Sequence, residues 1–168
     1  MHRFPHSRMP VLLAFAAIVA TCLLLAASVS RSAQTPPALK VAEHPKLGPY
    51  LTTGGGTSVY LFEEDRPDGE RGRPVESDCV DTCLERWPPV PGEPLPEAGE
   101  GADATLIGSF RRPDGKVQAM YNGWPLYTFA DDYVPGDLNG HDFEEFGGEW
   151  YLMTPAGREV PGSLRDTD

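Results

Sequence analysis

A repeat of the chain's own sequence, 67 residues apart, is the feature that most constrains the fold. Residues 56–70 align with residues 123–137 without a gap, and eight of these fifteen positions hold like residues. The matching positions of the first copy are Gly56, Val59, Tyr60, Phe62, Glu64, Asp65, Gly69 and Glu70, and those of the second are Gly123, Leu126, Tyr127, Phe129, Asp131, Asp132, Gly136 and Asp137. Such self-similarity indicates two copies of one structural unit. The sequence therefore predicts repeat one at residues 47–90, a linker at 91–103 and repeat two at 104–162.

The first thirty residues predict export from the cytosol. Residues 1–8 carry two arginines and no acid, residues 11–27 are apolar apart from one threonine, and small residues follow up to Ser30. This order is typical of a secretory signal peptide, so we expect cleavage after Ser30. The apolar run is long for a signal and short for a membrane span, which leaves an uncleaved N-terminal anchor as the alternative.

The segments on either side of the repeats predict little structure. Residues 31–46 are polar and contain proline, and we interpret them as a flexible tether. Residues 163–168 are expected to fray. Cys22 lies inside the apolar run, whereas a lipid-anchor cysteine is expected at the end of such a run.

Composition favours short strands and excludes some partners. Beyond residue 30 the chain holds 12 Lys and Arg against 25 Asp and Glu, a net charge of −13. A domain this acidic is not expected to bind nucleic acid or an anionic membrane through its charge. Glycine and proline, 18 of each, favour turns over long helices. We therefore predict a mostly β fold, an antiparallel meander of two tandem repeats whose two sheets share a core of Tyr, Phe and Trp.

Local patterns place the elements of this fold. Alternating apolar residues between turn signals predict strands, and a capping residue before an apolar turn predicts one helix over Ser77–Arg86, which carries Cys-x-x-x-Cys. The predicted strands are residues 50–52, 57–63, 105–111, 116–121, 125–130 and 149–154, with a last short strand around 158–160. Asn122-Gly123 is a type I′ turn signal. The acidic, glycine-rich stretch 131–148 is predicted to be a loop.

Several motifs occur together in an order that resembles a known family. They are Tyr60–Asp65, the run from Cys79 to Pro89, the stretch from Gln118 to Asp132, and Pro135–Asp137. Over residues 47–155 the chain resembles the bacterial secreted proteins and lipoproteins with a Tyr-x-aromatic-x-x-Asp signature, also called the secreted repeat of unknown function. The resemblance implies an extracytoplasmic β-repeat module and implies no reaction.

The aromatic–Asp motif allows two interpretations. Side chains two apart on a strand share a face, so the Tyr and Phe of each copy point the same way. They could be core residues, with the Asp capping the turn that follows. They could instead form a binding face on which rings stack against a flat ligand. The residues concerned are Tyr60, Phe62, Asp65, Trp87, Trp124, Tyr127, Phe129 and Asp132.

Cys79 and Cys83 predict a disulfide. They are the two cysteines beyond the signal, and exported proteins keep disulfides oxidised. One helical turn separates them, which lies within the range that a disulfide can bridge. Copper(I) ligation by two thiolates and a redox-active pair remain alternatives.

The acidic loop supplies weak candidates for chemistry. Asp137, Asn139 and His141 could contribute ligands to a calcium site, although their spacing is not that of an EF-hand. His141 is expected to be an exposed loop residue. A hydrolase would need a cleft lined by Asp132, Asp137 and Glu145. The sequence has no nucleophile elbow, phosphate-binding loop or zinc-protease motif.

These observations predict a non-enzymatic exported module that binds a ligand or serves a structural role at the cell exterior. We expect no cofactor, an extracytoplasmic ligand or protein as partner, and membrane contact only through the N-terminal segment. The alternative is a redox or metal-handling protein that uses Cys79 and Cys83.

Overall fold

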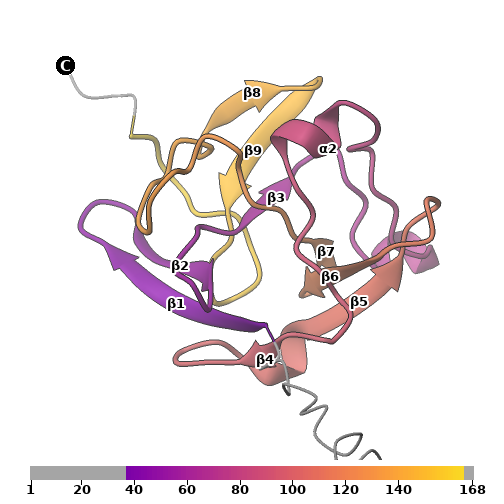
Figure 1. Cartoon of the computed structure of the whole chain (residues 1–168), viewed down its shortest axis with the longest axis horizontal. Coiled ribbons are helices and arrows are strands. Elements are labelled where there is room, and N and C mark those ends of the chain that lie inside the picture. The colour runs from indigo at the N-terminus through magenta and orange to yellow at the C-terminus, as the bar shows by residue number, and fades with distance from the viewer. Residues whose placement is uncertain (1–36, 165–168) are drawn as a thin grey trace, which may run out of the picture. The chain divides into compact units, whose positions relative to one another are not determined.

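The computed structural model describes residues 37–164 (Figure 1). The predicted signal peptide and the first part of the predicted tether lie outside the described residues. Nine strands form three small sheets, with the orders β2-β1-β4, β3-β9-β8 and β5-β6-β7. The strands are β1 (Ala38–His44), β2 (Gly48–Thr53), β3 (Tyr60–Phe62), β4 (Glu97–Ala98), β5 (Ile107–Arg111), β6 (Val117–Tyr121), β7 (Trp124–Pro125), β8 (Phe143–Glu145) and β9 (Gly148–Leu152).

Helical structure is confined to single turns in the described part of the chain. These are α2 (Cys83–Arg86) and the 3-10 turns η2 (Glu70–Gly72) and η3 (Ala104–Leu106). No helix within residues 37–164 is long and apolar enough to cross a membrane. The mostly β fold class is confirmed, with three sheets where two were predicted.

Strand β1 corrects the predicted tether. Residues 38–44 pair antiparallel with all of β2, from Leu39 opposite Thr53 to His44 opposite Gly48. Leu39 is fully buried. The tether prediction is wrong for these residues because their pairing with β2 and the burial of Leu39 make them part of the folded domain.

The predicted linker also belongs to the fold. Strand β4 pairs parallel with the start of β1, and Gly99 N–H donates to Leu39 O at 2.7 Å. Val41 N–H donates to Glu100 O at 2.9 Å. The connection between the repeats therefore lies along β1 and is not a solvated spacer.

The two repeats exchange segments across a pseudo-two-fold relation. Met153 N–H, at the end of repeat two, donates to Val59 O of repeat one at 3.0 Å, and Val90 N–H, at the end of repeat one, donates to Leu126 O of repeat two at 2.8 Å. Each repeat thus completes the sheet of the other. A meander predicts pairing between neighbours in sequence, and this exchange is the main departure from it.

The strands that carry the repeated motif lie between two hydrophobic cores, one on each face. The aromatic core contains Leu47, Tyr50, Tyr60, Phe62, Cys79, Cys83, Trp87, Tyr127, Phe129, Leu138, Trp150, Leu152 and Val160. The aliphatic core contains Leu39, Leu51, Val59, Leu61, Val90, Ala119, Tyr121, Leu126 and Met153. Tyr60 and Phe62 face the first and Leu61 the second, as a two-residue period requires.

Most other predicted strands are present with shifted bounds. The Asn122-Gly123 turn has φ of 50° and 82°, the two positive values that a type I′ turn needs. The predicted strand 125–130 is reduced to β7 and two isolated bridges at Tyr127, with Tyr60 and with Pro89, and β8 lies inside the predicted loop 131–148. Leu164, in the tail that was expected to fray, packs against the aromatic core.

Candidate functional site

The tyrosine and aspartate of the repeated motif bond between repeats. Tyr60 Oη donates to Asp132 Oδ2 at 2.7 Å, and Tyr127 Oη donates to Asp65 Oδ2 at 2.6 Å. The other carboxylate oxygen accepts a backbone N–H in each case, from Asn139 at 3.0 Å and from Asp78 at 2.8 Å. The aspartates therefore join the two repeats and a more distant loop, where the sequence predicted a cap for the next turn.

Burial raises the pKa values of all four groups. Asp65 is 3% exposed, and this desolvation raises its pKa to about 7, against the hydrogen bonds from Tyr127 and Asp78 that lower it. Desolvation also raises the pKa of Asp132, which is only partly buried. Burial raises the pKa of Tyr60 and of Tyr127 as well, so both phenols remain protonated donors.

A buried arginine extends the network around Asp65. Arg112 is 4% exposed, and its guanidinium donates to Ser77 Oγ at 3.0 Å, to Gln118 Oε1 and to Cys79 O at 2.6 Å. Ser77 Oγ lies 2.7 Å from Tyr127 Oη, which connects the arginine to the Tyr–Asp pair. Arg112 Nε has no hydrogen-bond partner. The positive charge of Arg112 acts to lower the pKa of Asp65.

Four rings form a continuous stack through the aromatic core. The order is Phe62, Trp150, Trp87, Phe129, with centroid separations of 4.2, 3.8 and 4.2 Å and interplanar angles of 13°, 5° and 26°. Two tyrosines meet the tryptophans edge-on, Tyr60 against Trp87 at 5.5 Å and Tyr127 against Trp150 at 5.1 Å. The stack is therefore symmetric about its centre, with each phenylalanine against the tryptophan of the other repeat.

The motif rings are therefore interior groups. Tyr60, Phe62, Tyr127 and Phe129 are each at most 4% exposed. Trp87 is fully buried, and its Nε1–H donates to Glu145 Oε2 at 2.9 Å. Trp124 is half-buried against the aliphatic core. None of the four motif rings offers the open stacking face that the second interpretation of the motif required.

Cys79 and Cys83 form the predicted disulfide, with a Cα–Cα separation of 5.3 Å. The helix that carries it is shorter than predicted and begins only at Cys83, because Asp81 has φ of 51° and interrupts the helical path. Neither Ser77 nor Asp78, the candidate capping residues of the predicted helix, caps it, since its N-cap residue is Thr82 and Ser77 contacts Tyr127 and Arg112 instead.

The weak calcium candidates hold the acidic loop together. Asp137 Oδ2 accepts the N–H groups of Tyr133 and Val134 at 2.8 and 3.0 Å, and Asn139 Nδ2 donates to Asp131 O at 2.9 Å. Among residues 37–164, no three His, Cys, Asp or Glu side chains gather as metal ligands would.

The prediction that His141 is exposed is wrong. It is 2% exposed, its Nε2 lies 2.9 Å from Gly162 O, and its Nδ1 accepts Leu152 N–H at 3.3 Å. The ring joins the acidic loop to β9 and to the C-terminal segment, so its role is structural.

The hydrolase hypothesis required Asp132, Asp137 and Glu145 to line one cleft. The structure gives each carboxylate a different set of partners. Asp132 bonds Tyr60, Asp137 bonds two backbone N–H groups, and Glu145 accepts from Trp87 and lies 3.5 Å from Arg86 Nε. The charge of Asp137 helps to raise the pKa of Asp132, whereas Glu145 is engaged with Trp87 and Arg86.

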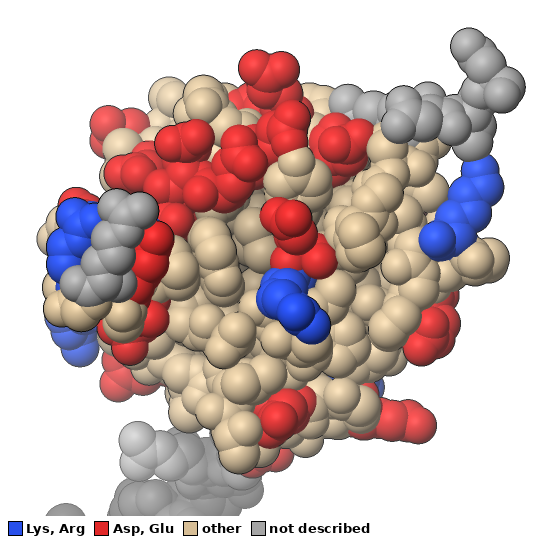
Figure 2. All heavy atoms as spheres, turned by 180° about the vertical axis from the view of Figure 1, so that it is seen from behind, with Lys and Arg blue, Asp and Glu red and all other residues tan. Residues whose placement is uncertain are grey.

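Acidic side chains gather on one face of the molecule, as Figure 2 shows along its upper part. Glu149 is close enough to four other acids that their negative charges add to desolvation in raising its pKa. The four are Glu63, Asp142, Glu144 and Glu159. Such a gathering of negative charge repels other anions at short range.

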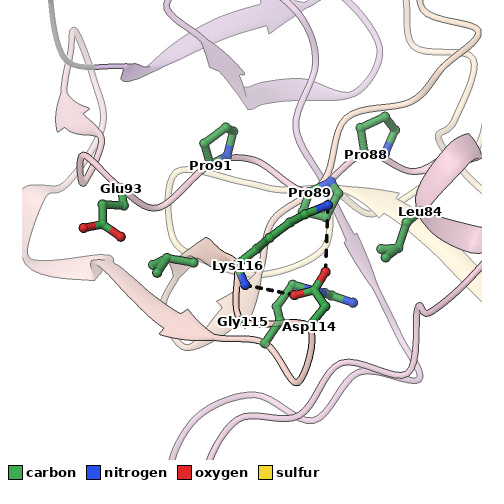
Figure 3. Close-up of a pocket in the computed structure, with 10 residues that line it drawn as sticks. Leu84, Pro88, Pro89, Pro91, Glu93, Asp114, Gly115 and Lys116 are labelled. Carbon is green, nitrogen blue, oxygen red and sulfur yellow. Dashed lines mark hydrogen bonds and ion pairs between the residues drawn. The ribbon is translucent and has the colours of Figure 1, made fainter.

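A surface groove lies between α2 and the β5–β6 turn (Figure 3). We call it the proline groove, and its volume is about 650 Å³. It is lined by Leu84, Pro88, Pro89, Pro91, Glu93, Arg112, Asp114, Gly115, Lys116 and Val117. Lys116 Nζ lies 3.9 Å from Asp114 Oδ2 on the rim. A volume and an apolar lining of this kind suit a small ligand.

A second, smaller groove of about 460 Å³ occupies the pseudo-two-fold equivalent place. Its lining includes Pro49 and Thr154. These two residues correspond to Val117 and Pro91, because Leu51 N–H donates to Met153 O just as Ala119 N–H donates to Val90 O. The two grooves therefore share part of their position in the repeats, while most of their lining residues differ.

Sequence reasoning missed Ser77, Arg112 and Gln118 as members of the motif network. The one available signal was Arg-Pro-Asp-Gly, which occurs at residues 66–69 and again at 112–115. Both copies were interpreted only as turns, and this interpretation does not show that the two arginines differ in burial. Arg66 pairs with Glu76 at the surface, whereas Arg112 is buried.

Comparison with known proteins agrees with the double repeat. The model of one family, described as a secreted repeat of unknown function, matches residues 42–91 and again residues 108–154, together more than half of the chain. No curated protein and no solved structure matches the chain. The family description supports an extracytoplasmic location. The two matched segments correspond to the two structural repeats that exchange their ends, and the chain belongs to the family of secreted repeats of unknown function.

Proposed function

We propose that this chain is a non-enzymatic, secreted binding module whose ligand contacts the proline groove. The observation that carries the proposal is that the polar motif residues bond one another, while a concave apolar groove lies at the surface. The polar atoms of both Tyr–Asp pairs bond one another inside the domain, while the proline groove is concave, apolar and open to a ligand. Groups that could act on a substrate are thus engaged in holding the repeats together.

The groove itself supports binding rather than catalysis. Its walls are formed by Leu84, Val117 and three prolines, which contribute apolar surface and no reactive group. The charged groups on the rim include Lys116 and Asp114, which pair with one another. Rigid apolar walls lose little conformational entropy when a ligand binds, which favours recognition of a small apolar or extended group.

The buried disulfide supports a structural role over the redox or metal-handling alternative. Cys79 and Cys83 are 0% and 2% exposed. Exchange with an external thiol needs access to a sulfur, and metal binding needs thiolates rather than a disulfide. The carbonyl of Cys79 accepts the buried Arg112, which ties this loop to repeat two.

The proposed ligand is an extracytoplasmic molecule with an apolar portion and no strong negative charge. Net charge, at −13 beyond residue 30, opposes polyanions such as nucleic acid. Membrane contact is proposed only for the N-terminal segment, if it remains uncleaved.

The experiment is an amide-detected NMR titration of the secreted protein with three uncharged probes, indole, benzyl alcohol and cyclohexanol. We expect saturable shifts at Leu84, Lys116 and Val117 for at least one probe. Leu84→Glu, which places a charge in the groove wall, should abolish them. Val80→Glu is the matched control, because Val80 is 50% exposed and does not line the groove.

Two results would count against the proposal. One is saturable binding that Leu84→Glu leaves unchanged, which would place the ligand elsewhere. The other is the absence of saturable shifts for every probe in a protein that remains folded.

A further inference from the structure

Arg112 places a buried positive charge beside the proline groove. The residue lines the groove and is 4% exposed. Its two Nη atoms donate to Ser77 Oγ, Cys79 O and Gln118 Oε1. None of these three acceptor residues belongs to the groove lining. The part of the guanidinium that is left to face the groove is therefore its Nε side.

The Nε–H group of Arg112 has no acceptor among residues 37–164. The arginine of the other Arg-Pro-Asp-Gly segment differs in this respect. Arg66 Nε donates to Pro74 O at 3.2 Å, and the Arg66 guanidinium pairs with Glu76. No carboxylate of the described chain forms an ion pair with Arg112. A buried donor without an acceptor is unfavourable, and an acceptor that arrives with a ligand removes this cost.

We propose that the proline groove recognises an uncharged carbonyl compound, whose oxygen accepts the Arg112 Nε–H while its apolar part contacts the groove walls. This ligand class presupposes the binding role proposed above for the groove. A carbonyl oxygen accepts hydrogen bonds and brings no donor of its own, so it matches a site whose unsatisfied group is a donor. Leu84, Val117 and the prolines of the lining supply the apolar contacts.

The charges around the groove favour an uncharged acceptor over a carboxylate. Glu93 and Asp114 are exposed acids of the lining, whereas Lys116 is its one exposed cation among the described residues. The Lys116 ammonium lies 3.9 Å from Asp114 Oδ2, which already balances its charge (Figure 3). The domain as a whole is acidic and repels an approaching anion. A neutral oxygen avoids this repulsion and still gains a charge-assisted hydrogen bond from the guanidinium.

A ligand oxygen reaches Nε only when the lining rearranges, because this atom is itself buried. Lys116 is the lining side chain with the least to hold it. It is 80% exposed, and its ion pair with the exposed Asp114 contributes little to stability. We therefore expect the ligand to displace the Lys116 side chain, which extends from the β5–β6 turn along the groove (Figure 3).

The test compares two probes of similar size in NMR titrations of the secreted protein. The probe 1-indanone has a carbonyl acceptor and no donor, whereas indole has an N–H donor and no carbonyl. Both should shift the backbone amides of Leu84 and Val117, but only 1-indanone should move the side-chain Nε–H signal of Arg112 downfield. The affinity for 1-indanone should be about tenfold higher, which is the contribution expected of a hydrogen bond to a charged group.

Two variants separate the hydrogen bond from the charge of the groove. Lys116→Gln removes the exposed cation and should keep the preference for 1-indanone over indole. Arg112→Met removes the donor and should abolish the preference. If Arg112→Met does not fold, the Nε–H signal of the wild type, assigned through its bonds to the Arg112 side chain, decides the question.

Three results would overturn the assignment of a carbonyl ligand. The first is equal affinity for both probes, with Leu84 and Val117 shifted and the Arg112 Nε–H signal unmoved, which would leave the binding role of the groove intact. The second is tighter binding of 1-indanecarboxylate than of 1-indanone, which would assign the site to an anion. The third is the absence of saturable shifts for every probe, which would remove the binding role together with the ligand class.

Discussion

Tyr60 and Tyr127 exchange backbone hydrogen bonds across the centre of the domain. Tyr60 N–H donates to Tyr127 O at 2.9 Å, and Tyr127 N–H donates to Tyr60 O at 3.0 Å. The residues occupy the same position in the two copies of the repeat, so the pair marks the pseudo-two-fold axis. Their side chains then diverge, each toward the aspartate of the opposite repeat. Both strands and both carboxylates thus contribute to one inter-repeat interface.

The two Tyr–Asp bonds should differ in strength although they are equivalent in sequence. Tyr127→Phe should lower the free energy of unfolding by about 2–3 kcal/mol, because Asp65 is buried where water cannot replace the lost donor. Tyr60→Phe should cost about 1 kcal/mol, because Asp132 is partly exposed. Urea denaturation at pH 8 measures both variants. Equal costs, or a larger cost at Tyr60, would contradict the argument from burial.

Stability should depend on pH through Asp65. Its pKa rises from 3.8 to about 7 on folding, so its protonated form is favoured in the folded state. The resulting stabilisation is present in full below about pH 4 and is lost as the pH rises through 7, by roughly 2–4 kcal/mol. Asp65→Asn should flatten the dependence of unfolding free energy on pH between 4 and 7.

Asp132→Asn is the control for this pH effect. Desolvation raises the pKa of Asp132 too, but the side chain is less buried, so its removal should change the slope less. Urea denaturation at half-unit pH steps compares the wild type with both variants. A slope that is unchanged in Asp65→Asn would show that other groups titrate over this range.

The sequence predicted the double repeat and the faces of its strands because both are local signals. A match at a constant spacing of 67 residues needs no knowledge of contacts. The alternation that sends Tyr60 inward to one core and Leu61 to the other follows from strand geometry alone. The disulfide was also predictable, because Cys79 and Cys83 are four residues apart and are the two cysteines beyond the predicted signal peptide of an exported chain.

The exchange of segments between repeats was not predictable from local patterns. Nothing in the composition near Val90 indicates that its partner is Leu126 rather than a residue of its own repeat. Strand β1 was missed for a related reason, because its pairing with β2 is set by a core that the sequence does not describe. His141 lies in an acidic loop and is buried only because that loop folds back over β9.

The symmetry of the ring stack predicts paired mutational effects. Phe62→Leu and Phe129→Leu should each lower the free energy of unfolding by about 1–2 kcal/mol and agree within about 0.5 kcal/mol, because each ring stacks at 4.2 Å on a buried tryptophan. Phe146→Leu, at a residue that is 42% exposed, should change it by less than about 0.5 kcal/mol. Urea denaturation measures all three. Costs for the two stacked rings that differ by more than 1.5 kcal/mol would show that the stack is not energetically symmetric.

The disulfide should stabilise the fold without contributing to ligand binding. Closing a loop of about five residues reduces the entropy of the unfolded chain by an amount worth about 2 kcal/mol. The double variant Cys79→Ala and Cys83→Ala should lose this stability, together with about 1 kcal/mol from the smaller buried side chains.

Two further measurements separate this structural role from a redox role. The double variant should keep the NMR shifts that probes induce at Lys116, because the proline groove does not include either cysteine. The wild-type disulfide should resist dithiothreitol in the folded protein and become reducible in urea, because both cysteines are buried. Rapid reduction without unfolding would contradict this expectation, since it would show that an external thiol reaches a sulfur in the native state.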